Sequence, residues 1–189
     1  MVLLRRYDLI GIDLAVRKPS SLAGYSKGSK IEIWRMTPCE LLEEGLETEL
    51  VVIDASLSLP KEGAFRDFER EVLSRGYKLL PVKKGPMRDL AIMGSQLKLK
   101  LESKGVKVLE THPSSALKAI GMTRYHVVSL LSKVGFTPSP PVSEDDEDAL
   151  ICLLVGMLYL KGGVEIFEGE EGSMVLPKLG LRLRDLDLT

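Results

Sequence analysis

Three carboxylates in this chain each come directly after a short hydrophobic run. They are Asp13, Asp54 and Glu110, which follow residues 9–12, 50–53 and 106–109. Runs this apolar suit strands that are covered on both faces, so each acid is expected at the rim of a buried sheet. Unpaired charges at such a rim are costly, and no cluster of Arg, Lys or His is adjacent to them in the sequence. The simplest counter-ion is a divalent metal held by oxygen ligands, which predicts a metal-dependent phosphodiesterase.

A fourth group of acids, residues 144–148, opens a helix. Asp145 and Asp148 are three residues apart, so their Cβ atoms lie about 5–6 Å from each other on one helix face, close enough to share a metal. Asp146 instead completes a capping box with Ser143, which explains it without any metal. The predicted metal ligands on this helix are therefore Asp145 and Asp148.

The residue types indicate which metal is expected, and they argue against two other kinds of active site. Carboxylate oxygens are hard ligands, and the chain contains only 2 His, so Mg²⁺ or Mn²⁺ is expected rather than zinc. His112 follows Glu110 closely, but a lone loop histidine is more often a hydrogen-bonded structural residue. The Gly24–Gly28 segment has the spacing of a nucleophile elbow, yet a second strand follows it, which indicates a hairpin turn. No phosphate-binding glycine loop stands in a suitable context.

The strands and helices expected from the sequence, which must position these acids, indicate a mixed α/β sheet. Strands are expected at residues 5–16, 21–26, 30–36, 50–55, 77–82 and 106–111. Helices are expected at residues 38–49, 64–75, 86–104, 114–120, 125–134 and 144–161. Short connections join the first three strands, which favours an antiparallel meander, and the alternation that follows favours parallel strands. Ligands gather at the carboxyl ends of parallel strands, where the three strand-end acids are expected.

Length and composition indicate one ordinary globular domain. The chain has 189 residues, of which 44% are hydrophobic and 28% charged. We expect a domain over residues 1–161 and a C-terminal extension over 162–189, packed on the same domain and carrying short strands at 164–167 and 174–176. Cys39 and Cys152 are far apart, so no disulfide framework is expected. The absence of a signal-peptide pattern and of an apolar run long enough to span a bilayer predicts a cytoplasmic protein with no membrane role.

Charge is distributed unevenly along the chain. The net charge is −1, which argues against a binder that depends on bulk positive charge. Residues 61–107 contain 12 Lys or Arg against 6 Asp or Glu, whereas residues 144–172 contain 9 acids and one lysine. A basic flank beside an acidic site would suit phosphate chemistry, although a solvated helix surface explains the same excess equally well.

Four short motifs occur in an order that resembles a known family. They are Gly11-Ile12-Asp13-Leu14-Ala15, residues 53–60, Glu110-Thr111-His112-Pro113 and residues 145–150, with intermediate signatures at Arg66-Asp67-Phe68-Glu69 and Gln96. In this order they resemble the domain of unknown function 429 family of predicted RNase H-like nucleases. The resemblance covers residues 7–160. It departs from the family at Ser56, where many members are expected to have proline.

The resemblance implies an α/β fold with a ribonuclease H-like mixed sheet: a three-strand antiparallel meander plus parallel strands, flanked by helices. It implies that Asp13 is on the first strand, Asp54 on the parallel strand beside it, and Asp145 or Asp148 on the last helix. That helix is similar to the last helix of RuvC-type junction resolvases. The role of Glu110 stays open, because related nucleases differ in which strand supplies the second acid.

The first functional hypothesis is a Mg²⁺- or Mn²⁺-dependent nuclease that hydrolyses phosphodiester bonds. Its metal-binding and catalytic residues would be Asp13, Asp54, Glu110, Asp145 and Asp148. Two metals bridged by Asp13 would activate water and stabilise the leaving 3′ oxygen. The expected partner is nucleic acid, either DNA or RNA, and a homodimer stays open.

Two alternatives keep the same fold. One is an ATP-dependent phosphotransferase of the hexokinase/actin type, against which Leu14-Ala15 lacks the glycine that would let a phosphate approach the first hairpin. The other is a non-catalytic module that binds nucleic acid or protein, whose binding would survive EDTA and acid-to-amide changes.

Overall fold

The structure, a computed structural model, describes residues 6–82, 85–138 and 142–181. Five strands form the main sheet and two more form a hairpin: β1 Tyr7–Asp13, β2 Ser20–Tyr25, β3 Glu32–Met36, β4 Thr48–Asp54, β5 Lys107–Thr111, β6 Val164–Gly169 and β7 Gly172–Pro177. The helices are α1 Pro38–Glu43, α2 Asp67–Ser74, α3 Pro86–Ser103, α4 Pro113–Ile120, α5 Arg124–Val134 and α6 Glu144–Leu160. In the part of the chain that is described, none of these helices has the length and apolarity needed to cross a membrane.

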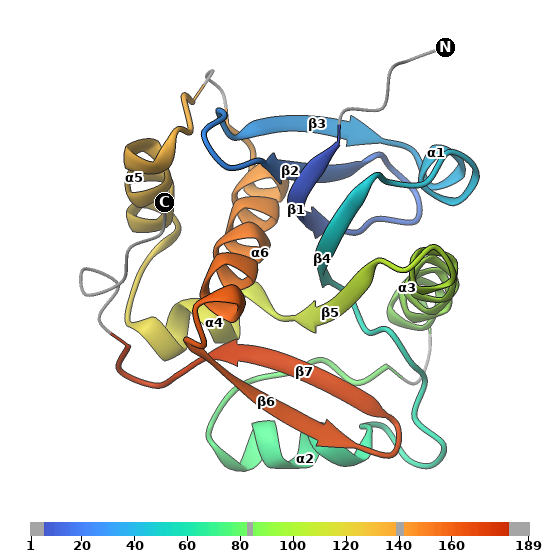
Figure 1. The fold of residues 1–189 in the computed structure, drawn as a ribbon. Coiled ribbons are helices and arrows are strands. Elements are labelled where there is room, and N and C mark those ends of the chain that lie inside the picture. Colours follow the sequence, from blue (N-terminus) through green and yellow to red (C-terminus); the bar gives the residue numbers. More distant parts are fainter. Residues whose placement is uncertain (1–5, 83–84, 139–141, 182–189) are drawn as a thin grey trace.

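The main sheet has the strand order β3-β2-β1-β4-β5 (Figure 1). β1, β2 and β3 form an antiparallel meander, and β4 and β5 continue the sheet parallel to β1. This is the ribonuclease H-like mixed sheet that the sequence predicts. Because β1, β4 and β5 are parallel, their carboxyl ends meet at one edge of the sheet.

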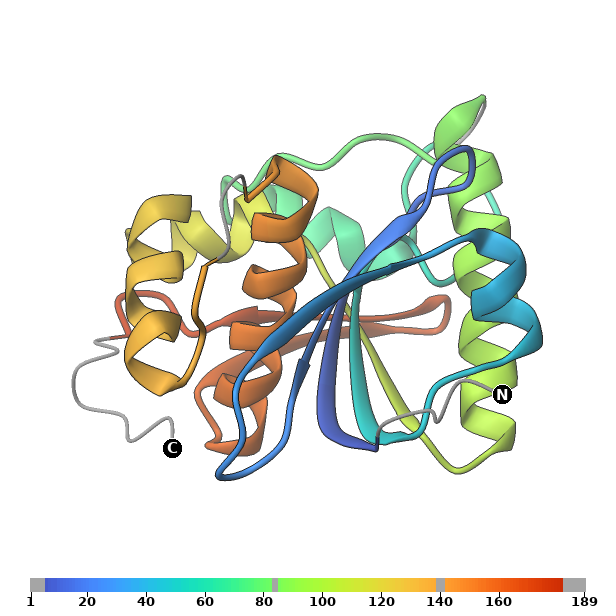
Figure 2. The ribbon, with the colours of Figure 1, turned by 90° about the horizontal axis from the view of Figure 1, so that it is seen from above.

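Helices cover both faces of the sheet, which explains why its central strands are continuously apolar. Figure 2 shows α3 against one face and α6, with α5 behind it, against the other. Ile10 and Ile12 of β1 pack in the core on the α3 side, whereas Leu9 packs in the core on the α6 side. The same alternation of period two runs along β4.

Helix α6 crosses β1 unusually closely, and two glycines allow this. A Cβ atom at Gly11 would overlap the α6 backbone at Ala149 and Leu153. A Cβ atom at Gly156 would overlap the side chain of Leu9. Since no other residue type lacks a Cβ, these glycines bring the start of α6 directly beside the end of β1.

The C-terminal hairpin β6-β7 forms a separate two-stranded sheet. It lies beside β5, where the Thr111 hydroxyl donates to the carbonyl of Val175 at 2.8 Å, and Val175 is buried in the α6-side core. On its other side the hairpin packs on α2 through Phe68 and Phe167 (Figure 1). The division into a domain over 1–161 and an extension over 162–189 stays a prediction, and residues 182–189 lie outside the described part.

Three element predictions were wrong or imprecise. Residues 77–82 form no strand; they run as irregular chain, held by the Val82 amide donating to the carbonyl of Ala64. The helix expected over 38–49 ends at Glu43, because Gly45 takes a positive φ and the chain then turns into β4. The helix expected from residue 64 begins at Asp67, after the extended residue Arg66. The other predicted helices and strands are confirmed to within a few residues.

Candidate metal centre

Three of the predicted carboxylates lie together at the carboxyl edge of the sheet. Asp13 ends β1 and Asp54 ends β4, and the two residues are direct partners in the parallel register. Asp148 reaches the same place from the second turn of α6, which Gly11 allows to approach β1. One oxygen from each of the three carboxylates lies within 4.8 Å of the others. Among the described residues, this is the group whose spacing fits a shared cation.

The electrostatics of this group disfavour three bare charges. Burial, together with the nearby charges of Asp145 and Asp148, raises the pKa of Asp13 to about 7. Burial also raises the pKa of Asp54 well above its usual value, and the charge of Asp13 adds to that rise. Neither carboxylate accepts a hydrogen bond from a side chain in the described part of the chain. A bound cation would remove this electrostatic cost.

Asp148 and its neighbour Asp145 have cationic partners that the sequence did not indicate. Arg124 of α5 donates to both oxygens of Asp148, at 2.8 and 3.0 Å, while burial still raises the pKa of Asp148. Lys18, in the β1–β2 connection, forms an ion pair with Asp145 and contributes a lowering effect on the pKa of Asp13. No cluster of cations is adjacent to these acids in the sequence, but the fold brings Arg124 and Lys18 to them from distant segments.

Asp146 behaves as the capping residue that the sequence predicts. Its backbone amide donates to the Ser143 hydroxyl, and its carboxylate accepts from the Ser143 amide at 3.0 Å. The same carboxylate accepts hydrogen bonds from Ser21 and from Arg35. Burial opposes its ionisation, but these hydrogen bonds outweigh burial and lower its pKa. Asp146 is thus directed to β2 and β3, away from Asp148.

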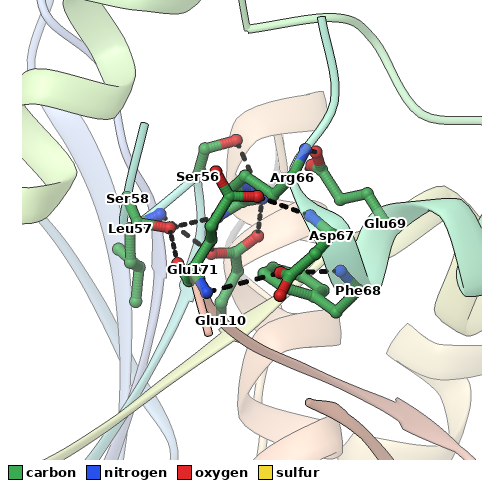
Figure 3. Close-up of polar contacts among 9 residues, drawn as sticks. All are labelled: Ser56, Leu57, Ser58, Arg66, Asp67, Phe68, Glu69, Glu110 and Glu171. Carbon is green, nitrogen blue, oxygen red and sulfur yellow. Dashed lines mark hydrogen bonds and ion pairs between the residues drawn. The ribbon is translucent and has the colours of Figure 1, made fainter. Parts of the chain in front are cut away.

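Glu110 lies in a second buried ion cluster, centred on Arg66 (Figure 3). Arg66 donates to both oxygens of Glu110 and to Glu69, and its side chain is fully buried. The Leu57 amide also donates to Glu110 at 2.8 Å. Burial lowers the pKa of Arg66, but Glu110 and Glu69 outweigh it, so the guanidinium stays protonated. The structure does not bring Glu110 into the Asp13 group, and its assignment as a metal ligand stays a prediction.

The Arg66 cluster fixes the chain segment that leaves the candidate metal centre. Arg66 donates to the hydroxyls of Ser56 and Ser58, which follow Asp54. Next to it, Asp67 accepts from the amides of Glu170 and Glu171 at the tip of the β6-β7 hairpin (Figure 3). The cluster therefore ties the end of β4, the end of β5, α2 and the hairpin together.

Lys100, which belongs to the basic region over residues 61–107, does not lie beside the candidate metal ligands. Lys100 donates to the backbone carbonyl of Glu43, which precedes β4, whereas Asp54 ends that strand. At 1.5 Å per residue, Lys100 is about 20 Å along α3 from its first residue, Pro86. Cations whose charges lower the pKa values of Asp13 and Asp54 come instead from other segments, namely Lys18 and Arg35 for Asp13 and Arg124 for Asp54.

Comparison with known proteins adds little to the geometry. No family model matches this chain, and no curated protein sequence matches it. Among solved structures, the Thermus thermophilus RuvC structure aligns over 89% of this chain and 99% of that chain, with 16% identity and a TM-score of 0.44. The fold class therefore rests on the order and directions of the strands in this chain.

Proposed function

We propose that this protein is a divalent-metal-dependent nuclease of the domain of unknown function 429 family, with Asp13, Asp54 and Asp148 as its principal metal ligands. The observation that carries the proposal is the convergence of these three carboxylates at the edge where parallel strands end. Their all-oxygen donor set suits Mg²⁺ or Mn²⁺. Asp145 lies beside Asp13 and is proposed as a further acid of the site.

The residues of the site would have different roles in phosphodiester hydrolysis. A divalent cation held here would polarise a phosphoryl oxygen and lower the pKa of a water. Asp13 stands between Asp54 and the α6 acids, so it is the group placed to be shared. Lys18 and Arg124 are proposed to meet phosphate oxygens, because each is already held at the rim of the site by an acid.

The first experiment compares cleavage of labelled DNA and RNA in Mg²⁺, Mn²⁺ and EDTA. Asp13→Asn should abolish divalent-dependent cleavage, because the amide keeps the shape of the side chain and loses its charge. Asp8→Asn is the matched control, since Asp8 lies at the other end of the same strand and accepts from the Lys27 amide. Normal turnover by Asp13→Asn would contradict the proposal. Calorimetric binding of Mn²⁺ gives a readout that does not depend on finding the substrate.

A non-catalytic binding module is the second candidate, and one observation favours it. Arg124 already neutralises Asp148 without any metal. In that case nucleic-acid binding would persist in EDTA, and neither Asp13→Asn nor Asp148→Asn would change it. The same set of binding and cleavage measurements therefore separates the two candidates.

A further inference from the structure

A hollow of about 230 Å³ opens directly beside the candidate metal ligands. One wall contains the carboxylates of Asp13 and Asp54, and another is apolar, with Leu14, Met87 and Leu90. Its volume is below the roughly 300–1,000 Å³ of pockets for drug-sized ligands. The hollow therefore suits one small ring system placed next to a group that is held at the metal centre.

Residues 77–82, which do not form the predicted strand, supply the outer rim of this hollow. Leu79 and Leu80 both line it, and Leu80 is 64% exposed. An exposed leucine at the mouth of a pocket offers an apolar contact to a bound ligand. The position of this rim suggests that the ligand is covered from outside by apolar side chains.

Polar groups line the same hollow at positions where a heterocycle could bond. Ser56 accepts from Arg66 Nη2 at 3.3 Å, so its hydroxyl proton is free to be donated. His112 shares a hydrogen bond between Nδ1 and Ser115 at 2.8 Å, and the described residues give Nε2 no partner. Nε2 of His112 can therefore form a hydrogen bond with a ligand in the hollow. The pocket thus combines an apolar wall with a few hydrogen-bonding groups and four carboxylates, of which Glu69 and Glu110 are neutralised by Arg66.

A second, more open hollow of about 370 Å³ continues past the site. It shares Leu14, Met87 and Leu90 with the first hollow and adds Arg17 and Lys18. A chain with a ring in the first hollow and an anionic backbone beside these two cations would pass Leu14, which lines both hollows and directly follows Asp13. This arrangement matches a strand of nucleic acid better than an isolated small molecule.

We infer that the first hollow receives an unpaired nucleobase, so that the substrate is a single strand or a duplex with one nucleotide turned out of the stack. This inference rests on the proposed nuclease function and specifies its substrate. A base inside an intact duplex is stacked on both faces and cannot enter a pocket. Single-stranded nucleic acid is bound by surfaces that pair cations for the backbone with flat contacts for the bases.

The test measures binding without turnover, in Ca²⁺, with a short oligonucleotide that carries 2-aminopurine. The single strand should bind at least about tenfold more tightly than the same sequence in a duplex, and an abasic site at one position should weaken binding several-fold. Leu80→Ser should weaken binding of the single strand about three- to tenfold and reduce the change in 2-aminopurine fluorescence. Leu99→Ser is the matched control, because Leu99 is 69% exposed on α3 and lies outside both hollows.

The possible failures are distinguishable. Equal affinity for single strand and duplex, with no effect of an abasic site, would overturn the base pocket while leaving divalent-dependent cleavage intact. A mononucleotide that binds as tightly as the oligonucleotide would overturn the assignment to a strand. Absence of Mn²⁺ binding and of any cleavage would instead refute the proposed nuclease.

Discussion

Two clusters of acids, one buried and one half-buried, lie at the carboxyl edge of the sheet, and they differ in what neutralises them. In the Arg66 cluster, Glu110 and Glu69 share a guanidinium that is fully buried, and the Leu57 amide adds a further donor. In the candidate metal centre, Asp13 and Asp54 have no such side-chain donors among the described residues. Arg124 reaches Asp148, but in the part of the chain that is described Asp13 and Asp54 stay without a hydrogen-bonded cation. Acids that the fold pairs fully are part of the structure, whereas acids that it leaves without a donor are placed to bind a ligand.

The largest expected effect comes from removing the cation of the Arg66 cluster. Arg66→Met should lower the free energy of unfolding by about 3–5 kcal/mol, because it leaves Glu110 buried without its counter-ion. Arg75→Met is the control, since Arg75 forms exposed ion pairs with Glu71 and Glu165, worth about 1 kcal/mol or less. Urea unfolding followed by circular dichroism measures both. Equal losses in the two variants would show that the Arg66 cluster is not structural.

The next largest effect is the change in stability on adding Mn²⁺, which should depend on the candidate metal centre and not on the Arg66 cluster. Saturating Mn²⁺, at about 100 times its dissociation constant, should stabilise the wild type by about 2.7 kcal/mol. Asp13→Asn should lose this response and, in EDTA at pH 8, should be more stable than the wild type by about 0.5–2 kcal/mol. Glu110→Gln should be destabilised in EDTA but keep the response to Mn²⁺. Thermal unfolding measures all three proteins, and loss of the metal response in Glu110→Gln would restore Glu110 as a ligand.

These two clusters also show how far the sequence could lead. The central strands, α3 and α6 could be predicted, because the strands are short apolar runs and each helix has a hydrophobic period, a cap or a glycine at its end. The place of β4 beside β1 was implied only by the family resemblance. Asp54 and Glu110 look alike in the sequence, since each ends or nearly ends a buried strand. They differ through Arg66, which lies 44 residues before Glu110 and meets it only in the folded chain. A sequence pattern identifies an acid at a strand end but not the cation that reaches it.

The same limit explains the cations that were missed. Arg124 and Lys18 are isolated in the sequence, and no local pattern connects them with acids on α6. Residues 77–82 were misjudged for a related reason. Their apolar run resembles a strand, but no neighbouring strand pairs with it, and its leucines line the hollow instead.

A smaller effect should appear in the dependence of stability on pH. The pKa of Asp13 is raised from 3.8 to about 7, so the folded state holds this proton more tightly than the unfolded chain does. The stability that this group contributes is complete below about pH 4 and is lost as the pH rises through about 7. In EDTA, the wild type should therefore lose more stability than Asp13→Asn between pH 5 and 8. Urea midpoints measure the difference, and parallel pH curves would contradict the assigned shift.

The smallest expected effect tests whether helix α6 carries both a structural acid, Asp146, and a metal-binding acid, Asp148. Asp146 is two residues from Asp148, yet it is saturated by Ser21, Ser143 and Arg35. Asp146→Asn should cost about 1 kcal/mol of stability, through a weaker cap and a lost ion pair, and should keep most of the binding of Mn²⁺.

Asp148→Asn provides the opposite result on the same helix. It should keep the fold, because Asp148 takes no part in the cap, and it should weaken Mn²⁺ binding strongly. Residues two apart on a helix point about 200° from each other, so the two side chains cannot easily serve one ion. Urea unfolding should therefore show the larger loss of stability for Asp146→Asn, and calorimetry should show the larger loss of Mn²⁺ binding for Asp148→Asn. If Asp146→Asn loses the metal and Asp148→Asn keeps it, then α6 presents a different face to β1, and the metal centre lies on the β2 side of the helix.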